Sequence, residues 1–265
     1  FIDIITKNMI LSIISMIIVC LLIIFFYDFK KTYKYIDLKI KVNMANVYSI
    51  LKKGFFTFAI SFLGMYVLNA PKYSIDTYLT NNYQTIFGII VMPATVIGLV
   101  AQFLIHPYLN QIVALYENKD LKNLKKLLTK LILLIIGFGV ISIILAYLFG
   151  TQILGIIYGL DLSSYKIGLS IIILSAIFYA IGTIYSSVLT TVRETVSQFI
   201  IYIIVSIIAG ILSNFCTKTW EINGSIIAYL LIMAIQSISY TVYTNLKLKT
   251  IFEKKENKKV WKTKK

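Results

Sequence analysis

Four polar residues follow one another at helical spacing within a long apolar run. Thr95, Gln102, His106 and Asn110 are separated by seven, four and four residues, so at about 100° per residue they share one face of a helix. Such a stripe could line a cavity that hydrogen-bonds sugar hydroxyls or a phosphate, or it could be a hydrogen-bonded seam between helices. Pro107 favours the cavity, because a kink frees backbone carbonyls that need water or a partner.

Charged residues near the expected helix ends have two interpretations as well. Lys72 and Asp76 are four residues apart and could pair across one helical turn, either as interfacial residues that reach water or as cavity residues. In a cavity, the lysine would offer a cation to a phosphate and the aspartate a carboxylate to a coupling ion. Arg193, the only arginine, precedes Glu194 in a short turn and suits either bidentate phosphate contact or membrane anchoring.

Catalytic motifs are absent from the sequence. It contains no GxSxG, HExxH, aspartate-rich or Walker motif, and His106 is its only histidine. The expected outer loops hold Asp76, Asp161 and Glu221 as their only acids beyond the N-terminal stub. We therefore expect no enzymatic activity, no metal and no cofactor.

The composition requires a membrane to position these residues. Hydrophobic residues make up 58% of the 265 residues and charged residues 14%, and the mean hydropathy is +0.84, which excludes a water-soluble fold. Cys20 and Cys216 both lie in apolar runs and are expected to be small core residues, not a redox pair. We expect an all-α integral membrane protein.

Seven apolar runs are long enough to cross about 30 Å of hydrocarbon. They are Met9–Tyr27, Gly54–Pro71, Tyr83–Pro107, Leu131–Phe149, Ile167–Leu189, Ser197–Cys216 and Ile222–Thr244. The third run continues without charge to Tyr116, and Pro93 and Pro107 within it predict a kink or a short unwound stretch.

The distribution of basic residues predicts the orientation. The segments after the first, third, fifth and seventh runs hold 22 of the 26 lysines and arginines, whereas the opposite side holds only Lys7, Lys72, Lys166 and Lys218. Because basic residues accumulate on the cytoplasmic side, the N-terminus should be outside and the C-terminal tail inside. The formal charge of +15 thus follows from topology and membrane lipids, and we expect no nucleic-acid partner.

The chain is expected to have three parts. Residues 1–53 comprise the first membrane helix and an amphipathic cytoplasmic segment, Asp28–Lys53; residues 54–246 form a six-helix bundle; and residues 247–265 form a basic tail that frays or lies on the membrane. No cleavable signal peptide is visible. The first residue, Phe1, and the odd helix count suggest the later part of a longer protein.

Five segments, taken in order, resemble a known transporter family. They are NAPKYSIDTYL from Asn69, QTIFGIIVMPATVIGLVAQFLIHPYLNQIVALYENKDLKNLKKLL from Gln84, GTQILGIIYG from Gly150, TTVRET from Thr190 and INGSIIAYLL from Ile222. With their spacing and topology, they resemble the Wzx-type polysaccharide flippases of the multidrug/oligosaccharidyl-lipid/polysaccharide exporter superfamily. The similarity runs across nearly the whole chain.

This resemblance implies a fold and a function. The family has twelve helices in two six-helix lobes, so this chain looks like the last helix of the N-lobe followed by the complete C-lobe. It implies export of undecaprenyl-diphosphate-linked oligosaccharide across a bacterial plasma membrane, for O-antigen, capsule or exopolysaccharide. A coupling ion, H⁺ or Na⁺, and polysaccharide assembly proteins are then expected partners. Alternatives are a drug or peptidoglycan-precursor exporter of the same superfamily, or a membrane glycosyltransferase or polymerase.

Overall fold

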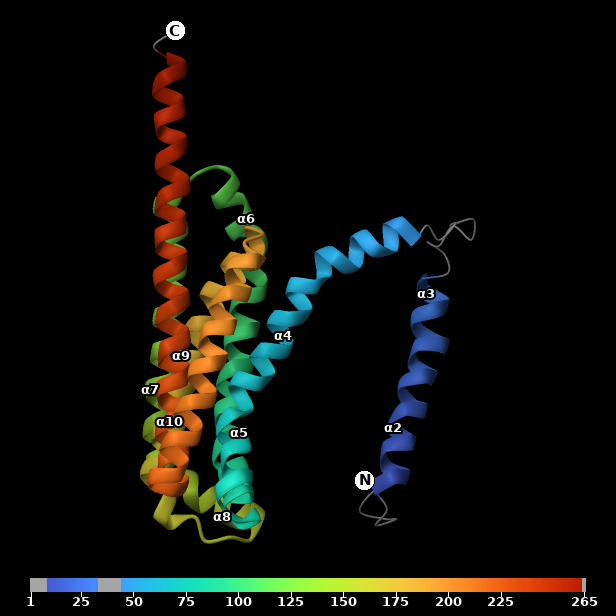
Figure 1. Cartoon of the computed structure of the whole chain (residues 1–265), viewed down its shortest axis with the longest axis vertical. Coiled ribbons are helices and arrows are strands. Elements are labelled where there is room, and N and C mark those ends of the chain that lie inside the picture. Colours follow the sequence, from blue (N-terminus) through green and yellow to red (C-terminus); the bar gives the residue numbers. More distant parts are fainter. Residues whose placement is uncertain (1–8, 33–43, 264–265) are drawn as a thin grey trace. The chain divides into compact units, whose positions relative to one another are not determined.

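The computed structural model describes the backbone of residues 9–32 and 44–263, and side chains as far as residue 250 apart from those of Met9 and Lys53. The described residues are almost entirely helical and contain no strand (Figure 1). The chain divides into two units, Phe1–Leu51 and Lys52–Lys265.

The first unit is built around one apolar helix. It contains α2 (Met9–Ile23), the π-helix η1 (Ile24–Phe29), α3 (Lys30–Thr32) and the first turns of α4 (Met44–Tyr78). Apolar side chains are exposed on every face of α2, including Cys20, which was expected in a core. A helix that is apolar all round is typical of a membrane span. The middle of the predicted amphipathic segment, residues 33–43, lies outside the described residues.

The second unit is a helix bundle that begins within α4. Its further elements are α5 (Asn81–Ile105), η3 (His106–Tyr108), α6 (Leu109–Glu117), α7 (Leu121–Leu145), η4 (Ala146–Gly150), α8 (Thr151–Tyr158), η5 (Ser163–Tyr165), α9 (Lys166–Thr191) and α10 (Thr195–Thr263).

Six helices in the described residues are long and apolar enough to cross a membrane. The longest, α10, is interrupted by non-helical backbone at Trp220 and Glu221, so it supplies two membrane segments and raises the number to seven. The predicted all-α, multi-pass membrane architecture is therefore confirmed.

Two helix ends differ from the predictions, and one predicted interruption is found. The second membrane helix does not end at Pro71 but continues through it to Tyr78, as transmembrane helices tolerate proline where neighbouring groups compensate. The unwound stretch predicted in the third run occurs at Pro107, where η3 interrupts the α-helix, whereas Pro93 remains inside α5. The last helix does not end with the seventh apolar run at Thr244, because α10 continues to Thr263.

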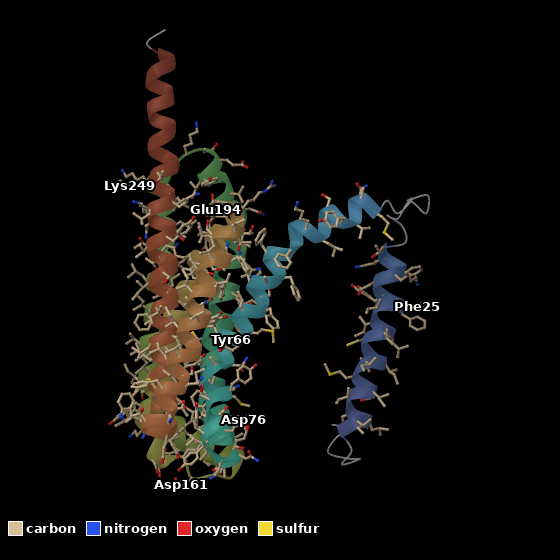
Figure 2. All side chains as sticks on the ribbon, in the orientation of Figure 1. Phe25, Tyr66, Asp76, Asp161, Glu194 and Lys249 are labelled. Atoms are coloured by element: carbon tan, nitrogen blue, oxygen red, sulfur yellow. The ribbon has the colours of Figure 1, made fainter. Side chains whose placement is uncertain are left out.

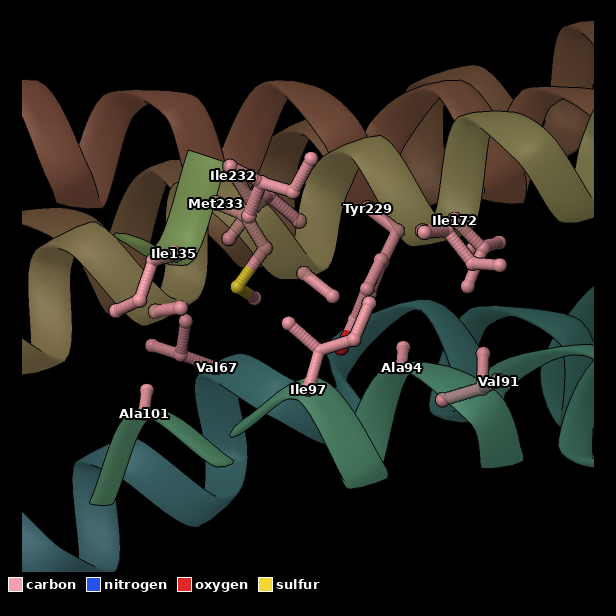
Figure 3. Packing of buried hydrophobic residues seen from close by; sticks show 14 of the residues in the cluster. Val67, Val91, Ala94, Ile97, Ala101, Ile135, Ile172, Tyr229, Ile232 and Met233 are labelled. Atoms are coloured by element: carbon pink, nitrogen blue, oxygen red, sulfur yellow. The ribbon is translucent and has the colours of Figure 1, made fainter. Parts of the chain in front are cut away.

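Helix α9 lies at the centre of the bundle. It packs against α5, α7 and α10, and its buried face carries Leu169, Ile172, Ala176 and Ala180. On α5 the buried face is built from small and branched side chains that meet the second half of α10 around Tyr229 (Figure 3). This packing fixes which face of α5 remains outside the bundle.

A tight turn joins the two halves of α10. Gly224 approaches the backbone carbonyl of Cys216 so closely that a Cβ atom would overlap it. Beside it the hydroxyls of Thr217 and Ser225 are hydrogen-bonded at 2.8 Å. The predicted burial of Cys216 is confirmed.

Two turns at the opposite end of the bundle share one backbone motif. Lys119 and Arg193 have φ of 63° and 61°, and each follows the last turn of a helix. The Arg193 N–H donates to the Thr190 carbonyl (3.1 Å) and the Glu194 N–H to the Leu189 carbonyl (2.9 Å). This is the Schellman arrangement, in which glycine usually occupies the left-handed position.

Candidate functional site

The polar stripe predicted from the sequence lies on the outside of the bundle. Thr95 and Gln102 are exposed on α5, His106 on η3 and Asn110 on α6. The opposite face of α5 carries the buried residues Ala94, Ile97 and Ala101 (Figure 3). Packing of the apolar face thus forces the polar stripe outward.

The stripe does not form an interhelical seam in the part of the chain that the structure describes. Thr95 donates a hydrogen bond to the Met92 carbonyl of its own helix (2.6 Å). The side chains of Gln102, His106 and Asn110 have no hydrogen bond or ion pair with any described residue. Of the two alternatives for the stripe, an interhelical seam within this bundle is wrong.

The length of the stripe limits which surroundings its polar side chains can have. Thr95 and Asn110 are separated by 15 residues, about 22 Å along a helix, or most of a hydrocarbon layer of about 30 Å. They lie within a membrane-length segment, Asn81–Glu117. An amide, hydroxyl or imidazole left in hydrocarbon without a partner costs several kcal/mol. The Thr95 hydroxyl is satisfied within its own helix, so the part of the stripe that requires water or another polar surface runs from Gln102 to Asn110.

Pro107 adds a backbone acceptor next to this stripe. Proline has no N–H, so the Phe103 carbonyl loses its usual donor four residues later. The chain tightens here into η3, where the Leu109 N–H bonds to the His106 carbonyl. The interruption thus falls beside the histidine, as the sequence predicted.

Lys72 and Asp76 do not pair with each other. Lys72 is half-buried and Asp76 is exposed on α4, and neither belongs to an ion pair among the described residues. One turn earlier the Asn69 amide donates to the Met65 carbonyl (2.8 Å). The four-residue spacing permitted the pair, but exposed ion pairs gain too little to hold two long side chains together.

Arg193 lies far from Asp76 along the bundle. Asp76 lies toward the end that carries Asp161, whereas Glu194, the neighbour of Arg193, lies toward the other end (Figure 2). The Arg193 side chain is exposed. The predicted site residues are therefore not gathered at one point: two lie near one end, one lies at the other, and the stripe runs along the bundle.

A polar cluster that the sequence analysis missed surrounds the turn between α9 and α10. Glu194 forms an ion pair with Lys247 (3.0 Å) and accepts a hydrogen bond from Ser197 (3.3 Å). Tyr243 donates to the Ser197 hydroxyl (2.5 Å). These contacts tie the start of α10 to its second half.

Two buried glutamines form hydrogen bonds between helical segments. Gln198, 1% exposed, accepts from Ser186 of α9 (3.2 Å) and donates to Thr190 (3.0 Å). Gln236 donates to the Tyr202 hydroxyl across the two halves of α10 (3.1 Å). The signals were Gln236 in the middle of an apolar run and Gln198 near the start of one, and both mark a seam of the kind considered as one alternative for α5.

Two aspartates outside the membrane segments have perturbed pKa values. The backbone N–H and side-chain amide of Asn123 both donate to Asp120, which caps α7, and these bonds lower the pKa of the carboxyl. The Ser163 hydroxyl and N–H lower the pKa of Asp161 in the same way. Both carboxylates stabilise local turns, and we assign neither to substrate binding.

The described residues contain no group of three or more histidine, cysteine, aspartate or glutamate side chains that could hold a metal. Comparison of the chain with protein-family models, with curated proteins and with solved structures finds no match.

Proposed function

We propose that this protein is a membrane exporter that moves a lipid-linked oligosaccharide from the cytoplasmic to the outer leaflet by alternating access. The observation that carries the proposal is the exposed polar stripe of Thr95, Gln102, His106 and Asn110 within a membrane-length segment. A hydrated path along this stripe would offer hydrogen bonds to its polar side chains, which hydrocarbon cannot do.

The chemistry of the stripe suits a sugar more than an ion. A hydroxyl, two amides and an imidazole offer both donors and acceptors, which is what a chain of sugar hydroxyls needs. An acidic side chain would repel a phosphate, and the four-residue stripe contains none. Such a ligand keeps its hydrocarbon tail in lipid while its polar part crosses along the helix.

The mechanism requires a second surface opposite the stripe. In the flippase family that the sequence resembles, this surface is a second six-helix lobe. Rocking of one lobe against the other would open the shared cavity to each side of the membrane in turn. We propose that the bundle from α4 to α10 acts as one such lobe.

Lys72 and Arg193 are the proposed phosphate contacts at the two ends of the path. Moving phosphate charge out of water without a counter-charge costs several kcal/mol. Both side chains lack an ion-pair partner among the described residues, so each is available to an anion. Their separation along the bundle suits a diphosphate that is received at one face and released at the other.

The test is surface polysaccharide in cells that lack the protein and receive a variant. We expect Lys72→Ala to reduce polysaccharide at unchanged protein abundance, and Lys72→Arg to retain part of it. Lys125→Ala is the matched control, because Lys125 is exposed on α7 outside the proposed path. Normal output from a Lys72→Ala, Arg193→Ala double variant would contradict the proposed phosphate contacts.

A further inference from the structure

A hollow of about 300 Å³ lies between α5, α7, α8 and α9 in the second unit. Pro93 and Val96 line it from α5, Ser142 and Ala146 from α7 and η4, and Leu169 and Ile173 from α9. We call it the lateral groove. It lies among membrane-length segments, so we expect it to be surrounded by hydrocarbon.

Local backbone geometry creates the lateral groove. The π-helix η4 interrupts the regular helix between α7 and α8, and α8 then approaches α5, where the Tyr158 hydroxyl contacts the Met92 sulfur (2.8 Å). Gly150 makes room for α9, since a Cβ there would lie 2.5 Å from a Leu169 methyl. The space left between the separated helices is the groove.

The lining has almost no hydrogen-bonding capacity. Ser142 is the only polar side chain in it, and its hydroxyl already donates to the Phe138 carbonyl of its own helix (2.9 Å). A sugar or a peptide backbone would lose its hydrogen bonds to water here and gain none. The occupant must therefore be apolar along its length.

The groove is separate from the polar stripe. At 100° per residue, Pro93 and Ile97 lie on the side of α5 roughly opposite Thr95. A ligand in the groove would not enter the proposed transport path. An α-helix, about 10 Å across, is also too wide to enter a hollow of this volume, whereas a single hydrocarbon chain is narrower.

One cation marks the end of the groove at the membrane surface. Lys166 is the first residue of α9, three and seven positions before Leu169 and Ile173, so it shares their face of the helix. Its ammonium lies 4.2 Å from the centre of the Tyr147 ring, next to Ala146 of the groove. It forms no ion pair with any described residue.

An apolar groove with a cation at one end, free of ion pairs to the described residues, matches the chemistry of one kind of membrane component. We propose that the lateral groove binds one acyl chain of an anionic phospholipid, with the lipid phosphate at Lys166. The distance along α9 from Lys166 to Ile173 is about 10 Å, so the phosphate and the first part of the chain lie along the same wall. This site goes beyond the proposed transport function.

The test uses the purified full chain in phosphatidylcholine vesicles that contain a trace of a lipid with a photoactivatable acyl chain. The probe is either phosphatidylglycerol or phosphatidylcholine, and mass spectrometry locates the crosslinked residues. We expect phosphatidylglycerol to label the groove residues roughly fivefold more than phosphatidylcholine, the gain typical of one lysine near a lipid phosphate. Lys166→Gln should remove this preference and Lys166→Arg should keep it.

A matched pair of variants tests the groove itself. Ile153 lines it and Ile144 does not, although both are 54% exposed on the same continuous helical segment. Ile153→Trp should lower groove labelling several-fold, and Ile144→Trp should leave it unchanged. Equal labelling of the groove by both lipids would overturn the proposal. It would also be overturned if labelling of the groove were no stronger than that of other lipid-facing residues. A third contradicting result is loss of the labelling when soluble glycerol phosphate, which has no acyl chain, is added.

Discussion

Replacing Arg193 by glycine should stabilise the protein even though it removes the only arginine. Arg193 occupies the left-handed position of the Schellman turn after α9, with φ of 61°. Its side chain is exposed and has no ion-pair partner among the described residues. The substitution therefore removes backbone strain at little cost in contacts.

The magnitude follows from two opposing contributions. A left-handed conformation costs an L-residue about 1–2 kcal/mol, which glycine does not pay. Glycine also makes the unfolded chain more flexible, which lowers the free energy of unfolding by about 0.4–1 kcal/mol. The net gain is about 0.5–1 kcal/mol, and alanine at this position should show none of it, because alanine keeps the strain and also loses the charge.

Thermal unfolding in detergent, at one fixed scan rate, measures the difference. At about 2–4 °C per kcal/mol for a chain of this size, Arg193→Gly should unfold at least 1 °C above Arg193→Ala. Lys125→Gly is the control, since Lys125 lies inside α7 and glycine there should cost about 1 kcal/mol relative to alanine. A glycine variant at position 193 that unfolds at or below the alanine variant would refute the assignment of strain.

Three further outcomes are expected. The pKa of the Asp120 carboxyl is lowered in the folded protein. Its contribution to stability is therefore present above the unfolded-state pKa of about 4 and is lost as the pH falls through the folded-state pKa. The difference in Tm between wild type and Asp120→Ala should shrink in acid. Gly224→Ala should destabilise by roughly 1–3 kcal/mol or more because its Cβ meets the Cys216 backbone, whereas Gly137→Ala, which meets open space, should not. A cysteine at position Thr80 should react with an impermeant reagent only from outside, and reaction only from the cytoplasmic side would reverse the topology.

Much of the fold follows directly from hydrophobicity. Apolar runs of membrane length are stable only in the hydrocarbon of a bilayer, so the membrane spans could be located from composition and length. The ends were less predictable, because a proline such as Pro71 stops a helix in water but not where the surrounding helices compensate. Nor did composition indicate that the lysine-rich tail would continue α10 to Thr263.

The site was predictable only in part. Spacing predicts Thr95, Gln102 and His106 on one face, and all three are exposed in the structure, but spacing does not tell which neighbour a face meets. The buried seam formed instead around Gln198 and Gln236, whose partners are distant in sequence or lie across a turn. Such partners depend on how the helices pack, and a single sequence does not supply that information.

The most direct test of the account is the accessibility of Gln102 to water within the membrane. In a background without Cys20 and Cys216, a membrane-impermeant thiol reagent should modify Gln102→Cys in intact vesicles, because a thiol reacts as the thiolate, which forms in water. Leu133→Cys is the control, since Leu133 is 62% exposed on α7 outside the stripe and should face lipid. Modification of Gln102→Cys alone is the result that the account predicts, and failure of both positions to react would contradict a hydrated path along α5.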